Sequence, residues 1–92
     1  MATSTINQDV ILQEIPYSSF AWDANNKLFF AANTLTNDKT LYGFLVRPTN
    51  GGAMMTACLS SDNSKIYVVG WIPTAKESIT ENYAFKLYAV MR

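Results

Sequence analysis

The stretch "LSSDNSKIYVVGWIPT", residues 59–74, decides the fold class of this chain. It begins with a turn rich in Ser, Asp and Asn and continues into β-branched and aromatic residues, which is the composition of a β-strand. Over residues 65–72 the apolar side chains occupy both odd and even positions, so the predicted strand is apolar on both faces. A strand of this kind requires cover on both sides, either from a second layer of the same chain or from another subunit.

The same pattern recurs along the rest of the chain, between turns such as "DANN", "RPTNGG" and "SSDNS". It predicts further strands at 8–15, 27–33, 40–47, 53–60 and 83–91. The sequence therefore predicts an all-β protein, an antiparallel sheet or sandwich of about six short strands, with room for one short helix.

An α+β fold with a helix at 53–60 or 75–82 is the alternative. The first segment contains Ala and Met, which are good helix formers, and its length fits a strand or a helix equally well. The second follows Thr74 as its N-cap, and Glu77 comes three residues after Thr74, which is the pattern of a capping box.

The composition indicates one small domain, residues 1–92, with few charges. Hydrophobic residues make up 49% of the chain and charged residues only 15%, while nine Thr, eight Asn and seven Ser supply most of the polar surface. The net charge is zero, which argues against a nucleic-acid partner. It also removes the repulsion between copies of the chain, so a homo-oligomer is expected, most simply a twofold dimer.

The chain lacks the residues that most enzymes and metal sites need. It has no His and a single cysteine, Cys58, which stands in the apolar context "MMTACLSS". Without His, the usual general base near neutral pH and the commonest metal ligand are missing. We therefore expect no catalytic activity, no metal, no cofactor and no disulfide.

Neither a secretory signal nor a membrane segment is expected. The start "MATSTINQ" has no basic region and no apolar core, and no apolar run is long enough to span a bilayer. The prediction is a cytoplasmic protein, or one released by an unconventional route, that does not insert into membranes.

Aromatic residues beside small polar residues are the one feature of the sequence that indicates a binding site. They coincide at residues 22–26 ("WDANN") and where Trp71 precedes the 74–82 loop. Sugars offer C–H patches that stack on aromatic rings and hydroxyls that pair with carboxylates, amides and ammonium groups. A carbohydrate site with Trp71 as the stacking platform is therefore predicted, with these polar partners: Lys76, Glu77, Glu81 and Asn82. A second polar set consists of Asp38, Arg47 and Asn50.

Two points stay open at this stage. Each of the two tryptophans, Trp22 and Trp71, can face a ligand, belong to the core or lie in a dimer interface. In addition, "WDANNKLFFAAN" (22–33) aligns with "SSDNSKIYVVGW" (60–71) at an offset of 38 residues. There are two explanations for this match: a duplication, or the general likeness of amphipathic hairpins to one another.

Three resemblances point to lectins. The succession "FAWDANNKLFF", "LTNDKTLYGFLV", "SSDNSKIYVVGW" and "FKLYAV" resembles the strands of the fungal immunomodulatory proteins, which are β-sandwich dimers with lectin-like behaviour. The segment "NSKIYVVGWIPTAKESITENY" is similar to a repeat of the bladed fucose lectins, which implies that Glu81 accepts a sugar hydroxyl. The short Asn- and Thr-rich chain without disulfides also resembles small mushroom fruit-body lectins of the α-galactosyl-binding Lyophyllum type.

These expectations combine into a lectin that binds glycans on glycoproteins or glycolipids, with galactose-type sugars as the first candidate. The alternatives are a protein-interaction module of the sandwich type and a self-assembling structural subunit. Neither the sugar nor the symmetry of the oligomer follows from the sequence.

Overall fold

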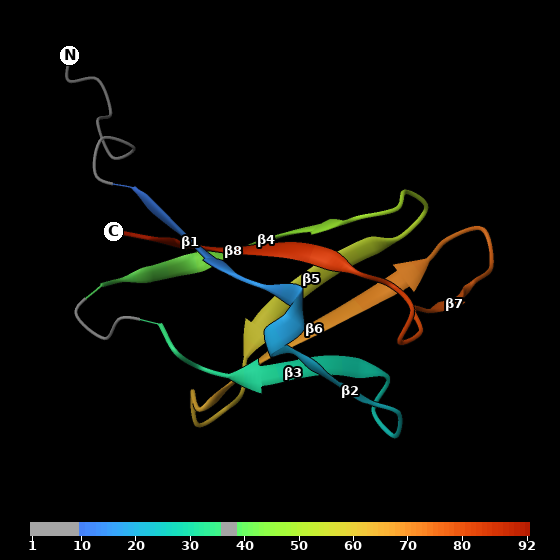
Figure 1. Ribbon diagram of the computed structural model, residues 1–92, viewed down its shortest axis with the longest axis horizontal. Helices are drawn as coiled ribbons and strands as arrows, with labels where there is room; N and C mark the ends of the chain where they lie inside the picture. Colours follow the sequence, from blue (N-terminus) through green and yellow to red (C-terminus); the bar gives the residue numbers. More distant parts are fainter. Residues whose placement is uncertain (1–9, 36–38) are drawn as a thin grey trace, which may run out of the picture.

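Two antiparallel β-sheets face each other in the computed structural model, which describes residues 10–35 and 39–92 (Figure 1). The three-stranded sheet has the order β1-β8-β4, with β1 at Ile11–Ile15, β8 at Phe85–Met91 and β4 at Leu41–Pro48. The five-stranded sheet has the order β2-β3-β6-β5, with β2 at Ala21–Asp23, β3 at Leu28–Ala32, β6 at Lys65–Ile72 and β5 at Met54–Leu59. Its fifth strand, β7 at Glu77–Ser78, pairs with the end of β6.

The all-β prediction is confirmed, and all six predicted strands are present. The bounds differ by a few residues at the ends, and residues 8 and 9 of the first predicted strand lie outside the described residues. Strands β2 and β7 were not predicted, because three-residue and two-residue strands are too short to show an alternating pattern.

The alternative with a helix at 53–60 or 75–82 is wrong. Residues 54–59 form β5, whose side chains alternate between exposed and half-buried, as on a sheet with one covered face. In the second segment Lys76 has a φ of 55°, the left-handed region, which stops a right-handed helix there. Within the described residues the helical structure is one 3-10 turn at Tyr17–Ser19.

Two of the connections that carry the chain between the sheets join edge strands. From the end of β1 the chain passes through the 3-10 turn to β2, and the turn is closed by the amide of Ser19, which donates to the carbonyl of Pro16 at 2.9 Å. Residues 49–53 connect β4 to β5 on the other side of the sandwich, where these two strands lie side by side. The edge strands of the two sheets are thus joined in pairs by short connections, which limits the rotation of one sheet on the other.

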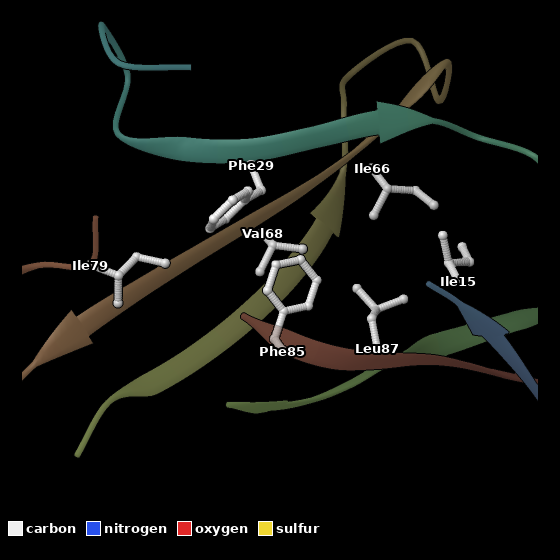
Figure 2. Packing of buried hydrophobic residues seen from close by; sticks show 7 residues of the cluster. All are labelled: Ile15, Phe29, Ile66, Val68, Ile79, Phe85 and Leu87. Atoms are coloured by element: carbon white, nitrogen blue, oxygen red, sulfur yellow. The ribbon is translucent and has the colours of Figure 1, made fainter. Parts of the chain in front are cut away.

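The core fills the space between the sheets. The cluster shown in Figure 2 takes side chains from both sheets and from the segment after β7. Its members are Ile15, Phe29, Ile66, Val68, Ile79, Phe85 and Leu87. Alternate residues of β8 are fully buried, which is the period of two expected for a strand with one face on the core. Each fully buried aliphatic side chain contributes about 1.5–3 kcal/mol relative to its exposed state.

Both sheets also carry apolar residues on the faces that point away from the core. On the five-stranded sheet Met54 is 61% exposed, Val69 40% and Trp71 44%; on the three-stranded sheet Leu12 and Leu45 are more than half exposed. The prediction that strands are apolar on both faces is therefore confirmed, but the second layer covers only one face of each sheet.

The internal match at an offset of 38 residues does not extend to the turns. Residues 22–33 form the β2–β3 hairpin, and residues 60–71 form the turn before β6 and most of β6. The left-handed residue is Lys27 in the first turn and Asn63 in the second, which are not aligned at that offset. The conformations of the two turns therefore give no support to a duplication.

Candidate functional site

Two hairpins of the five-stranded sheet have the same turn. In each hairpin, a Trp lies one residue before the residue that ends the first strand. Four residues then form the loop, and the fourth is a Lys with a φ of 55°. The first hairpin runs from Trp22 to Lys27 and the second from Trp71 to Lys76. Both β2 and β6 are antiparallel to β3, so the two turns lie at the same end of the sheet.

The two tryptophans point to opposite faces of the sheet. Trp22 pairs with the buried Phe29, and the two rings meet edge to face with centroids 4.8 Å apart, so Trp22 points toward the core. Trp71 pairs with Met54 on one side and Ser78 on the other, and its side chain is 44% exposed on the outer face. The faces differ because the two hairpins fold to opposite sides within the sheet. In the first hairpin, β3 lies on the side of β2 that faces β6; in the second, β7 lies on the side of β6 that faces away from β5.

A depression of about 250 Å³ lies between the β2–β3 turn and the segment that begins with β7; we call it the Trp22 depression. Its lining residues are Trp22, Ala24, Lys27, Glu77, Ser78, Ile79, Thr80 and Glu81. It combines one aromatic ring with two carboxylates, one ammonium group and two hydroxyls. These are the groups that recognise a sugar ring and its hydroxyls.

Buried contacts hold the two walls of the Trp22 depression. Trp22 is half-buried and packs edge to face against Phe29, so its ring is held by the core and is still partly exposed. The opposite wall is anchored by Ile79, which is 1% exposed, and by the hydroxyl of Tyr17, which donates to the carbonyl of Glu81 at 3.2 Å. The carboxyl groups of Glu77 and Glu81 are on exposed residues and are available to a ligand.

A second depression, of about 430 Å³, lies on the outer face of the five-stranded sheet. Phe30 and Tyr67, a cross-strand pair, form its floor, and the other lining residues are Asp23, Asn26, Leu28 and Lys65. Lys65 places its ammonium 5.7 Å from the centroid of the Phe30 ring, a cation–π contact.

Asp23, at the rim of this second depression, is oriented by the turn that follows it. Its Oδ2 accepts from the side-chain amide of Asn26 at 2.8 Å, and its Oδ1 accepts from the backbone amides of Asn25 and Asn26. The side-chain hydrogen bond from Asn26, which favours the carboxylate, is the main cause of the lowered pKa of Asp23. These bonds use much of the acceptor capacity of the carboxylate, so Asp23 has less to offer a ligand than Glu77 or Glu81.

A third feature, the Trp71 groove, is apolar. It has a volume of about 300 Å³ and lies on the outer face of the five-stranded sheet, along β5 and β6. Its lining residues are Met54, Met55, Thr56, Val69, Gly70 and Trp71. Thr56 is the one residue with a polar side chain, so the groove suits an apolar surface better than a sugar.

The structure divides the predicted set of site residues. Glu77 and Glu81 line the depression with Trp22, whereas Trp71 lines the separate apolar groove. Lys76 is the left-handed residue of the second turn. Asn82 is exposed in the segment after β7, and its backbone amide donates to Thr80 Oγ1 at 3.5 Å.

The second predicted set is not brought together by the described residues. Arg47, on β4, lines a pocket with Lys86 of β8, and Asn50 is exposed in the loop between β4 and β5. Asp38 lies outside the described residues.

The predicted site omitted six lining residues of the Trp22 depression, of which four have aromatic or polar side chains: Trp22, Lys27, Ser78 and Thr80. The shared spacing of Trp and Lys in "WDANNK" and "WIPTAK" was a signal that the two turns are alike. No sequence signal shows that the first turn lies against the segment after the second, because that contact depends on the strand order of the sheet.

In residues 10–35 and 39–92, no three His, Cys, Asp or Glu side chains are grouped so that they could hold a metal ion. Over the same ranges, no helix has the length and the apolar character needed to cross a membrane.

Comparisons with known proteins identify no relative: no family model, no curated protein and no solved structure matches the chain. The resemblances to fungal and bladed lectins therefore stay predictions.

Proposed function

We propose that this chain is a carbohydrate-binding protein without catalytic activity, and that the Trp22 depression is its binding site. The observation that carries the proposal is that the ring of Trp22 lines the same depression as the carboxylates of Glu77 and Glu81. Galactose-type glycans are the first candidate ligands, because galactose presents a continuous C–H patch on one side of its ring. This patch stacks on the exposed part of the indole.

The polar groups of the depression complete the recognition. The carboxylates of Glu77 and Glu81 accept hydrogen bonds from sugar hydroxyls, and the ammonium of Lys27 donates to sugar oxygens. The hydroxyls of Ser78 and Thr80 can do either. Because the depression is open to solvent and holds only one or two sugar rings, a single site binds weakly, and several sites on an oligomer would raise the apparent affinity.

A glycan array with the labelled protein tests the proposal, followed by calorimetric titration with the strongest ligand. The variants Glu77→Gln and Glu81→Gln keep the size of the side chain and remove its charge on exposed residues, so the fold is retained. Each is expected to weaken binding on the order of tenfold, since a hydrogen bond to a charged group is worth about 1.5–3 kcal/mol. Glu14→Gln, on β1 of the other sheet, is the matched control and keeps wild-type binding.

Two results would overturn this assignment. A folded protein that binds no glycan on the array would contradict the lectin function itself. Binding that survives both Glu variants unchanged would contradict the location of the site. Circular dichroism of each variant separates a lost site from a lost fold.

The Trp71 groove supports a second role, self-association, with a second copy of this chain as the partner. Exposed Trp and Met side chains are typical of the buried centre of protein interfaces. The chain has seven basic and seven acidic residues, so two copies do not repel each other. The groove is on the outer face of the five-stranded sheet, whereas Trp22 points inward, and a dimer formed there would leave both Trp22 depressions open.

Light scattering on Val69→Lys tests this second role. Val69 is exposed in the groove, and a Lys from each copy would place two like charges in the interface. We expect the variant to be monomeric, while Leu12→Lys on the outer face of the other sheet stays dimeric. A wild-type protein that is monomeric at all concentrations would contradict self-association. It would indicate that the groove binds a different protein.

A further inference from the structure

The outer face of the three-stranded sheet carries two cations directly opposite each other. Arg47 on β4 and Lys86 on β8 are register partners in an antiparallel pair. Side chains at such positions have their Cβ atoms about 4.5–5.5 Å apart, and like charges there repel each other. Both residues are exposed and belong to the same face of the sheet.

The position of this pair is fixed by its surroundings. Pro48, the residue after Arg47, pairs with Phe85, which is 2% exposed in the core. The backbone amide of Thr49 donates to the carbonyl of Ala84 at 2.9 Å, so the chain beyond β4 is held beside the start of β8. The two cations therefore cannot separate by fraying of the strand ends.

Within the part of the chain that the structure describes, neither Arg47 nor Lys86 forms an ion pair. Among the described residues, the repulsion between Arg47 and Lys86 is therefore not offset by an ion pair.

The two cations also line a pocket of about 210 Å³, together with Pro48 and Thr49. The guanidinium of Arg47 can donate two parallel hydrogen bonds to one oxyanion, and the ammonium of Lys86 adds a point charge. The backbone amide of Thr49 is already used, but its hydroxyl is free to donate in the pocket. One pocket is thus lined by residues that carry two positive charges and a hydroxyl, and its volume is large enough for a tetrahedral anion.

We infer that Arg47, Thr49 and Lys86 form a binding site for a tetrahedral oxyanion, a sulfate or phosphate ester. The site is on the three-stranded sheet and is independent of the Trp22 depression. A bound oxyanion relieves the repulsion between Arg47 and Lys86, so binding also stabilises the fold. Because both cations are exposed, the affinity falls as the salt concentration rises.

NMR titration of the full chain tests the inference. Sodium sulfate and sodium phosphate are added in separate titrations, and sodium chloride at equal ionic strength is the control. We expect the amide signals of Arg47, Thr49 and Lys86 to move with sulfate or phosphate and not with chloride. Galactose 6-sulfate, galactose 6-phosphate and galactose then distinguish the two ester sources from a site that needs only the sugar.

Lys86→Gln and Arg47→Gln are the test variants, and Lys65→Gln on the opposite outer face is the matched control. Each test variant is expected to bind sulfate on the order of tenfold more weakly, the loss of one charged hydrogen bond. Without sulfate the same variants should unfold at the wild-type temperature or above it, because the repulsion is gone, and this shows that the fold is intact. Lys65→Gln keeps the wild-type response.

Two results of the salt titrations would contradict the site. One is equal movement of the three amide signals in sulfate, phosphate and chloride, which would mean charge screening only. The other is an equal loss of sulfate binding in Lys65→Gln and Lys86→Gln, which would mean attraction to positive charge anywhere on the surface. If galactose alone moves these signals as far as its esters do, the oxyanion assignment is also contradicted.

Discussion

Ile79 lies directly over Gly70 of β6, and there is no space between them for a side chain. A Cβ added to Gly70 would be 2.7 Å from Cγ2 of Ile79 and 3.0 Å from the carbonyl oxygen of Met54. The backbone amide of Ile79 also donates to the carbonyl of Gly70 at 3.2 Å. This contact fixes the segment after β7 on the sheet, and with it the wall of the Trp22 depression that carries Glu77 and Glu81.

Gly70→Ala is expected to destabilise the protein by about 1–3 kcal/mol, the usual effect of overpacking in a core. Urea unfolding measures the change in the free energy of unfolding. Gly51→Ala is the matched control: nothing lies within 4 Å of a Cβ at Gly51, and its effect should be small. When Ile79→Ala is also present, Gly70→Ala should lower the free energy of unfolding by less than it does alone. If the effects of the two substitutions on the free energy of unfolding simply add, the contact is contradicted.

Lys76→Gly is expected to stabilise the protein by about 0.5–1 kcal/mol. Lys76 has a φ of 55°, where a residue with a Cβ is strained and glycine is not, although glycine also makes the unfolded chain more flexible. Thermal unfolding gives the comparison. Lys65→Gly, in strand β6, is the control and should lower the unfolding temperature, because glycine weakens a strand.

Asp62 should make the stability of the protein depend on acid pH. Its Oδ1 accepts hydrogen bonds from the hydroxyl and the backbone amide of Ser64 and from the hydroxyl of Ser60, at 2.7 to 3.0 Å. The side-chain bond from Ser64, then its backbone bond and the bond from Ser60, lower the pKa of Asp62 to about 2. The unfolded value is about 3.9, so this stabilisation is complete above pH 4 and disappears as the pH falls to about 2.

Urea unfolding at a series of pH values between 2 and 7 checks this sign. Asp62→Asn should be less stable than wild type at pH 7 and lose less stability below pH 4. Ser61→Ala, in the same turn, should follow the wild-type profile. A wild-type protein whose stability rises as the pH falls from 4 to 2 would contradict the account of the turn.

Much of the fold followed from alternation in the sequence, and the site did not. The strands around Ile66 and Leu87 were predictable because their periodicity of two is local information. That Trp22 meets Glu77 and Glu81 depends on the order β2-β3-β6 and on the antiparallel direction of each pair, which bring distant turns to one end of the sheet. Pairing between distant strands leaves no local pattern, so the sequence alone favours Trp71, which directly precedes the polar 74–82 loop.

Cys58 reports on the proposed dimer. It is exposed on β5, opposite Tyr67, on the same outer face as the Trp71 groove. If two copies pair through this face, the rate of thiol modification should fall as the protein concentration rises, and Val69→Lys should restore the fast rate. A rate independent of concentration in a protein that light scattering shows to be a dimer would place the interface elsewhere.

The most direct test of the central claim uses the two indole N–H signals, one for each tryptophan, in an NMR titration with the glycan that the array selects. Trp71→Phe assigns the two signals by removing one of them. The account predicts that the Trp22 signal moves with increasing glycan while the Trp71 signal stays, because only Trp22 lines the depression with Glu77 and Glu81. Movement of the Trp71 signal with a stationary Trp22 signal would contradict it and place the sugar in the apolar groove.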